Sequence, residues 1–381
     1  EGFIAACVEA GHPRNDDFNG ARQDGVGYHQ TTTRRGRRCS TAVGYLRPAM
    51  KRPNLQVITR AHTERVLFEG RRAVGVAFRQ DGVARQVRAR REVVLSGGAI
   101  GSPQILMLSG IGPAAHLAEM GVPVVHDLPG VGSDLQDHYS AAIKLKCALP
   151  ITVNDVMQSS VRKVRTGLEY LLFRKGALTV ITAEVALFAR TRPELATPDV
   201  KFSIATFSAD RPQDGLQPWS GFTLLVYQLR PESRGEIRLK SPRAEDAPAM
   251  RPNYLATETD RRTIVAGLQM GRSLLASPHM QRFITAEYLP GPEVRDEAGL
   301  LEHARRTGGT GFHPTSTCRM GSDPRAVVDA ELRVHGVEGL RVVDASVMPT
   351  VISGNTNAAT IMIAEKASDL LRARAPLAAA A

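Results

Sequence analysis

The chain has 381 residues, 43% of them hydrophobic and 23% charged, a balance typical of a globular protein long enough for two domains. No apolar run approaches the ~18–20 residues that a membrane span needs. The formal charge is +11, and 8 of the 49 basic residues are Lys. The arginines are scattered and the densest cluster, at 34–38, lacks interleaved aromatic residues, so compositional bias is favoured over a nucleic-acid-binding module. The four cysteines lie far apart without metal-ligand spacing, which predicts reduced thiols and no metal site.

The first 138 residues predict a helix end, then loops, then strands. Alternating apolar residues within 54–95 predict a β-meander whose strands lie at 55–59, 65–68, 73–78 and from Val87 onward, with Asp81-Gly82 as a hairpin turn. Residues 92–110 predict a buried strand, a glycine turn and a helix. In this helix Ser102 is the expected N-cap and Pro103 the first helical residue. This strand–turn–helix unit is typical of cofactor-binding edges in α/β folds.

Residues 139–305 mix strand-like and helical patterns, which predicts an α+β domain on an antiparallel sheet. The expected strands lie at 200–206, 222–229 and 236–239, and the expected helices at 161–174 and 258–276.

The last part of the chain carries two candidate functional positions. His313 follows Gly308, Gly309 and Gly311 and precedes Pro314, a loop that can fix a side chain in an unusual direction. A buried strand is expected at 340–346 and a helix at 356–373. One of Asn355, Thr356 and Asn357 is expected to cap that helix, and the alternative is that the helix N-terminus faces an anionic group.

Several segments together resemble the signatures of the glucose-methanol-choline flavin oxidoreductases, especially the choline-dehydrogenase-like alcohol dehydrogenases. The resemblance covers residues 1 to about 373 and is carried by residues 97–112, 128–138, 308–321, 340–346 and 353–360. It implies an α/β plus α+β fold, with part of an FAD-binding, Rossmann-like domain and an antiparallel-sheet substrate domain. The implied divisions are a substrate-domain or lid segment at 1–50, FAD-binding parts at 51–138 and 306–381, and the substrate domain at 139–305.

The resemblance also implies functional residues. His313 and Asn355 correspond to the catalytic pair that faces the flavin, with His313 as the base. The residues implied in FAD binding are Asp344 and Ala345 near the pyrophosphate, Asn357 and Thr360 beside the isoalloxazine ring, and Thr63 near the adenine.

The loop at 128–138 departs from the family pattern at one position. Asp134 replaces the usual Asn, which keeps an acceptor, loses the amide donors and adds a charge. His138, at the end of the same loop, is interpreted as structural.

The family's N-terminal strand–GxGxxG–helix unit has no counterpart in this sequence, and Glu1 starts inside a helix-like pattern. We therefore expect an N-terminally truncated family member. The implied function is oxidation of a primary alcohol, choline-like, aliphatic or aromatic, to the aldehyde. The electron acceptor is expected to be a quinone or respiratory carrier rather than oxygen, and the location cytoplasmic or peripheral to the inner membrane. The alternatives are an inactive fragment that cannot hold FAD and a hydroxynitrile lyase that uses the same pocket.

Overall fold

The computed structural model describes residues 1–179, 183–210 and 215–373, which form two compact units. Unit 1 comprises residues 1–52, 139–230 and 257–311, and unit 2 comprises 53–138, 231–256 and 312–381, described up to 373. The sequence grouped 231–256 with 139–305, whereas in the structure this segment clusters with unit 2. The reason is backbone pairing, because Gly235 bridges Leu135 and the Ile237 amide donates to the Gly132 carbonyl.

Unit 1 is built on one seven-stranded antiparallel sheet in the order β1-β11-β12-β13-β10-β16, with β17 also paired to β10. The sheet strands are β1 (Gly25–Tyr28), β10 (Tyr139–Cys147), β11 (Ala183–Ala189), β12 (Val200–Ala205), β13 (Gly221–Gln228), β16 (Ile284–Leu289) and β17 (Gly309–Thr310). The remaining elements are α1 (Gly2–Glu9), β2 (Thr33–Arg34), β3 (Arg37–Arg38), the π-helical turn η1 (Ala42–Leu46), α2 (Arg47–Ala49), α5 (Val153–Gln158), α6 (Ser160–Phe173), the 3-10 turn η2 (Ala177–Thr179), α7 (Glu258–Leu275), α8 (Pro278–Gln281) and α9 (Glu297–Thr307). The predicted antiparallel sheet is therefore confirmed.

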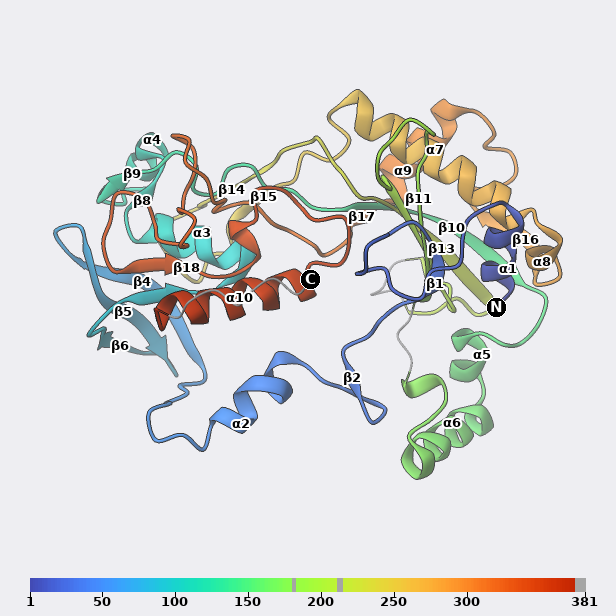
Figure 1. The fold of residues 1–381 in the computed structure, drawn as a ribbon, viewed down its shortest axis with the longest axis horizontal. Coiled ribbons are helices and arrows are strands. Elements are labelled where there is room, and N and C mark those ends of the chain that lie inside the picture. Colours follow the sequence, from blue (N-terminus) through green and yellow to red (C-terminus); the bar gives the residue numbers. More distant parts are fainter. Residues whose placement is uncertain (180–182, 211–214, 374–381) are drawn as a thin grey trace. The chain divides into compact units, whose positions relative to one another are not determined.

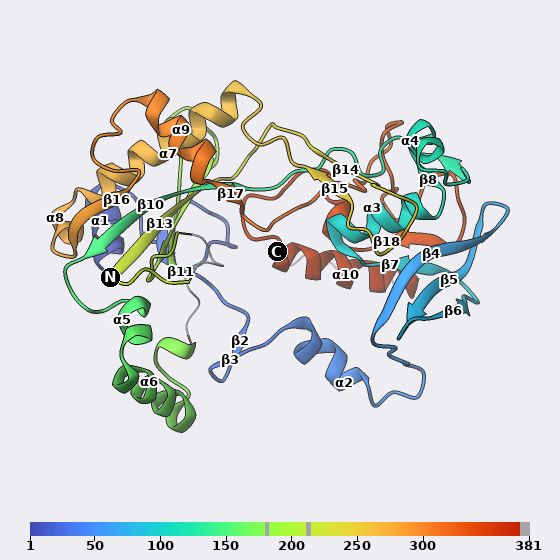
Figure 2. The same cartoon turned by 180° about the vertical axis from the view of Figure 1, so that it is seen from behind.

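Helix α7 covers one face of this sheet, with α9 beside it (Figures 1 and 2). Gly267 and Gly271 lie on the side of α7 that faces the strands. A Cβ atom added to Gly267 would come within 2.7 Å of the Val226 side chain, and one added to Gly271 within 3.0 Å of Leu224. The two glycines therefore let the helix backbone lie close to the sheet and bury Phe202 completely.

Unit 2 contains several small sheets around one hydrophobic core. Its three-stranded meander is β4 (Ala61–Glu69), β5 (Arg72–Gln80) and β6 (Val83–Arg88), and its two-stranded pairs are β7 (Val93–Leu95) with β18 (Leu340–Val342), β8 (Ile111–Gly112) with β9 (His126–Asp127), and β14 (Glu236–Arg238) with β15 (Ala249–Arg251). Its helices are α3 (Gly98–Leu108), α4 (Ala114–Glu119), the 3-10 turn η4 (Ala345–Val347) and α10 (Asn357–Leu371). Figure 1 shows α10 alongside α3 and β18, and Leu106, Val342 and Ile363 from these elements share the core.

The meander confirms one local prediction and corrects another. The Asp81-Gly82 turn joins β5 to β6, with φ of 49° and 81° at the two residues. The strand predicted at 55–59 is wrong, because within the described chain this segment pairs with no strand and Leu55, Val57 and Ile58 are exposed. Apolar alternation alone does not supply the neighbouring strand that a sheet requires.

Helix α3 begins earlier than predicted, at Gly98, so Ser102 and Pro103 lie inside the helix. Proline has no backbone N–H, and it cannot donate the usual hydrogen bond to the carbonyl of Ala99, four residues earlier. The Thr317 hydroxyl donates to that carbonyl instead, at 2.7 Å. The interior proline is thus accommodated by a side chain from a distant loop.

The described residues include no helix with both the length and the apolar character that crossing a bilayer demands.

Candidate active site

Two motif loops of unit 2, residues 128–138 and 312–321, lie side by side, and Gln136 joins them. Its backbone forms two hydrogen bonds with Thr315, at 3.2 and 2.9 Å. Its buried side chain donates to the Pro231 carbonyl at 2.9 Å and accepts from the Val351 amide at 3.0 Å. One glutamine therefore connects four separate segments around the candidate site.

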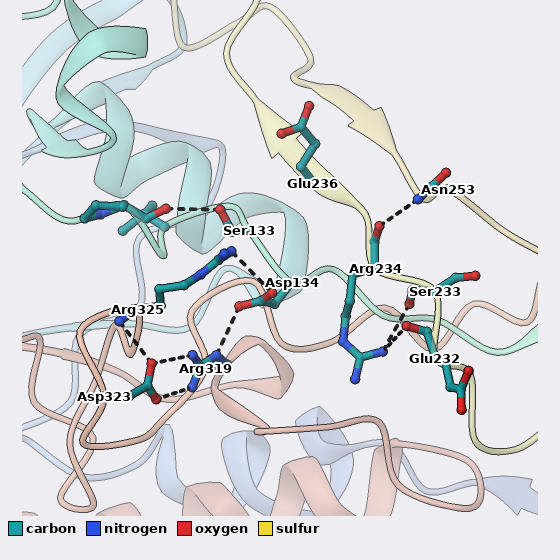
Figure 3. A network of polar contacts seen from close by, with 12 residues as sticks. Ser133, Asp134, Glu232, Ser233, Arg234, Glu236, Asn253, Arg319, Asp323 and Arg325 are labelled. Atoms are coloured by element: carbon teal, nitrogen blue, oxygen red, sulfur yellow. Dashed lines mark hydrogen bonds and ion pairs between the residues drawn. The ribbon is translucent and has the colours of Figure 1, made fainter. Parts of the chain in front are cut away.

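A charged network holds the same loops together further along (Figure 3). Arg319 donates to Asp134 at 3.1 Å and forms two 2.7 Å bonds with Asp323, while Arg325 reaches Asp134 at 3.4 Å. The hydrogen bonds from Arg319 lower the pKa of Asp323, and the same contacts raise the pKa of Arg319. Asp134 also has a φ of 58°, a left-handed conformation that Asp tolerates better than most residues. The extra charge that replaces the family's Asn is therefore neutralised by two arginines.

The backbone of His313 is fixed by a carboxylate from the neighbouring loop. The His313 amide donates to Asp137 Oδ1 at 2.8 Å, and the Tyr254 hydroxyl donates to Asp137 Oδ2 at 2.6 Å. The preceding residue, Phe312, has a φ of 60° and a side chain that is 79% exposed. A left-handed backbone is costly for a bulky residue and persists only where the surrounding contacts hold it. Such strain is common at functional sites.

The imidazole of His313 lies between two polar side chains. Its Nε2 atom is 3.0 Å from the amide nitrogen of Asn355, and its Nδ1 atom is 3.0 Å from Nδ1 of His138. The two histidine rings meet edge to face, with centroids 5.1 Å apart. The structure thus brings together His313 and Asn355, the two residues predicted to be catalytic. It adds His138, interpreted from the sequence as structural, on the other side of the His313 ring.

The start of α10 agrees with the prediction in position. Thr356, one of the three residues expected there, occupies the N-cap position with helical dihedral angles, and its side chain accepts no capping hydrogen bond in the described chain. The Asn355 amide donates to His313. No acidic residue lies in the first turn of the helix, which is fully described. The first turn therefore carries no acidic side chain of its own to compensate the positive end of the helix dipole.

The residues predicted to bind the cofactor lie at separate places in unit 2. Asn357 is the exposed first residue of α10, and Thr360 donates its hydroxyl proton to the Thr356 carbonyl at 2.8 Å. Thr63 lies in β4, opposite Phe78 of β5. Ala345 begins η4 directly after Asp344.

Asp344 makes the most contacts of this group. One carboxylate oxygen accepts from the Gly98 amide at 2.9 Å and the Ser102 hydroxyl at 2.6 Å, and the other accepts from the Ser346 amide at 2.8 Å. Asp344 thereby fixes the glycine turn at the start of α3.

Burial, reinforced by the nearby Asp344 carboxylate, raises the pKa of the Cys318 thiol, which stays protonated.

Sequence reasoning assigned Asp137 and Tyr254 no place beside His313, and it interpreted His138 as structural without a partner. The adjacency of a carboxylate and an imidazole at 137–138 was a usable signal. The partner loop, 175 residues further along the chain, was not visible from local pattern.

Chemically, this arrangement can accept a proton at a histidine nitrogen that is already oriented, and it can donate a hydrogen bond from a neighbouring amide to an oxygen atom.

Sequence and structure comparisons with known proteins cover nearly the whole chain. Two family models, both described as GMC oxidoreductase, match residues 1–140 and 231–364. The chain is 43% identical to oxygen-dependent choline dehydrogenase 1 of Chromohalobacter salexigens over 98% of its own length and 67% of the relative's. It is 44% identical to an alcohol dehydrogenase [acceptor] of Pseudomonas putida, over 97% of this chain and 67% of that protein.

A solved structure shows the same fold. Pyridoxine 4-oxidase from Mesorbium loti matches with a TM-score of 0.86 and 28% identity, over 98% of this chain and 70% of that one. The residues matched by the family models include both motif loops and the first part of α10, up to residue 364. The chain therefore belongs to the GMC oxidoreductase family.

Proposed function

We propose that the protein catalyses the FAD-dependent oxidation of a primary alcohol to the aldehyde, with His313 as the base. The substrate class is choline-like, aliphatic or aromatic alcohols. The observation that carries this proposal is the 3.0 Å contact between His313 Nε2 and the Asn355 amide, beside the N-terminus of α10. Membership of the GMC oxidoreductase family and the names of the choline and alcohol dehydrogenase relatives support it.

The residues present fit FAD. The first turn of α10 offers backbone donors and a positive dipole end, which suit the negative charge that a reduced flavin carries. Ala345, Asn357, Thr360 and the backbone at Thr63 are the proposed contacts. Because the Asp344 carboxylate already accepts three hydrogen bonds, its proposed part is to hold the glycine turn at 97–98 in shape. When bound, FAD supplies the hydride acceptor that amino-acid side chains lack.

The protein's own residues handle the proton. His313 Nε2 accepts the proton of the substrate hydroxyl, and the Asn355 amide donates a hydrogen bond to the oxygen as negative charge develops there. Asp137 keeps the His313 backbone in place through its 2.8 Å bond. The imidazole is therefore already oriented toward the substrate hydroxyl, and less conformational entropy is lost when the reacting atoms come together.

For the electron acceptor we propose a quinone or respiratory carrier rather than oxygen. The relatives point both ways, since one is named an alcohol dehydrogenase [acceptor] and another an oxygen-dependent choline dehydrogenase. Turnover of the enzyme with a soluble quinone and with dissolved oxygen, in parallel, separates the two.

The test of the activity is anaerobic bleaching of the flavin absorption in the purified, FAD-loaded enzyme. The panel contains choline, benzyl alcohol and a series of aliphatic primary alcohols, with the aldehyde identified as product. His313→Ala is expected to slow reduction by about 10²- to 10⁴-fold, the usual contribution of a general base. His335→Gln is the matched control, because His335 contacts the Gly321 carbonyl at 3.0 Å elsewhere in unit 2. Failure of every alcohol to bleach the flavin, or an unchanged rate in His313→Ala, contradicts the proposal.

A further inference from the structure

His138 is the residue whose contacts exceed a packing role. It is 1% exposed, it lies at the end of the 128–138 loop, and its Nδ1 atom is 3.0 Å from Nδ1 of His313. Its neighbour Asp137 accepts the His313 backbone amide at 2.8 Å. Two consecutive residues of one loop therefore hold the backbone and the ring of His313 respectively.

Hydrogen-bond chemistry restricts the protons in this cluster. A contact of 3.0 Å between two ring nitrogens needs one proton between them, because two lone pairs or two N–H groups would repel. On the other side of the ring, the Asn355 amide nitrogen can only donate, so Nε2 of His313 accepts. Neutral His313 must then carry its proton on Nδ1 and donate it to Nδ1 of His138.

We propose that His138 is a positioning residue that sets the tautomer of His313 and so keeps Nε2 unprotonated. In this structure the Nε2 lone pair accepts from the Asn355 amide, and it takes the substrate proton when that amide turns to the substrate oxygen. This proposal rests on the function proposed above. The substrate O–H bond breaks with its electron pair left on oxygen, and a new N–H bond forms at Nε2. The resulting imidazolium still donates its Nδ1–H to His138, whose lone pair stabilises the new charge.

The proposed arrangement requires His138 to stay neutral, so that its Nδ1 lone pair can accept. A second positive charge on a ring that is 1% exposed and directed at His313 would be costly. Asp137 is the acidic group beside the pair, and its two oxygens accept from the His313 amide and the Tyr254 hydroxyl. The arrangement therefore favours one neutral histidine that accepts and one that donates.

Two variants separate positioning from packing. His138→Leu removes the acceptor while keeping a side chain of similar bulk. His138→Asn keeps the hydrogen-bond acceptor, because an Asn amide oxygen can occupy the place of the histidine Nδ1 atom. We expect His138→Leu to lower kcat about 10- to 100-fold, the range for loss of the partner that orients a functional histidine in metal sites. The KM should change little, the acid limb of the pH profile of flavin reduction should move to lower pH, and His138→Asn should restore most of the rate.

The direct readout is the ¹⁵N NMR spectrum of histidine-labelled, FAD-loaded enzyme at neutral pH. The expected result is a protonated Nδ1 and an unprotonated Nε2 on His313, shifting toward protonated Nε2 in His138→Leu but not in His138→Asn. A protonated Nε2 in the unsubstituted enzyme, or a tautomer that His138→Leu leaves unchanged, overturns the inference. Equal rate losses in both variants overturn it as well. The spectrum needs no turnover, so the two proposals can fail separately. If the enzyme oxidises no alcohol but His313 shows the expected tautomer, the proposed function is refuted and the role of His138 in setting the tautomer stands.

Discussion

Thr317 gives a sharp test of how the interior proline of α3 is tolerated. Its buried hydroxyl donates to the Ala99 carbonyl at 2.7 Å, the acceptor that Pro103 leaves without its helical partner. Thr317→Val keeps the shape of the side chain and removes the donor.

The size of the effect follows from burial. Leaving a buried acceptor without its hydrogen bond costs about 1–3 kcal/mol. For a domain of roughly 150–250 residues, each kcal/mol moves the melting temperature by about 2–4 °C, so a fall of roughly 2–12 °C is expected. Thr317→Ser, which keeps the hydroxyl, is the control and should lose less.

A second substitution makes the reasoning refutable. Pro103→Ala restores a backbone N–H that can donate to the Ala99 carbonyl, so Thr317→Val should cost about 1 kcal/mol less in the Pro103→Ala background. The assay is thermal and urea unfolding of the four proteins of the cycle, all loaded with FAD. Costs that add to within about 0.5 kcal/mol would show that the two residues do not share this carbonyl.

Three further predictions rest on single side chains. Burial lowers the pKa of Lys201 from 10.5 to about 8. Below pH 8 the folded protein therefore holds a buried charged lysine that reduces its stability, and this loss of stability disappears as pH rises toward 10.5. Lys201→Met should therefore raise the free energy of unfolding by up to roughly 3 kcal/mol at pH 7 and by much less at pH 10.5 in urea titrations, and equal gains would contradict this. Asp134→Asn should lower stability by about 1 kcal/mol or less through its pair with Arg319, with the loss shrinking in 1 M NaCl, and a salt-independent loss would exclude an electrostatic origin. Tyr254→Phe removes a 2.6 Å bond to the buried Asp137 carboxylate and should cost about 1.5–3 kcal/mol by thermal unfolding, whereas an unchanged melting temperature would mean that the hydroxyl contributes nothing.

Local pattern predicted those elements whose cause is local. Helix α7 was expected at 258–276 and spans Glu258–Leu275, because Ile264, Leu268 and Leu275 recur on one face. The motifs also singled out His313 and Asn355, the proposed catalytic pair, and the structure places their side chains in contact.

What sequence reasoning missed depends on segments that meet only after folding. Asp134 reads as an unexplained charge until Arg319, 185 residues later, is found beside it. His138 reads as an ordinary buried histidine until His313 lies against its ring. The contact of Asn355 escaped local pattern for the same reason, because its amide donates to the imidazole of His313, 42 residues earlier in the chain.

The interleaving of the two units affects how the chain folds during synthesis. Strand β1 pairs with β11 in a register that joins Gly25 to Phe188, so it must wait for 163 more residues before its partner exists. At about 5–20 residues per second, this wait on the ribosome lasts roughly 8–33 s. During that time the apolar side of β1 and helix α1 has no sheet to pack on, which makes the nascent chain a candidate client for chaperones.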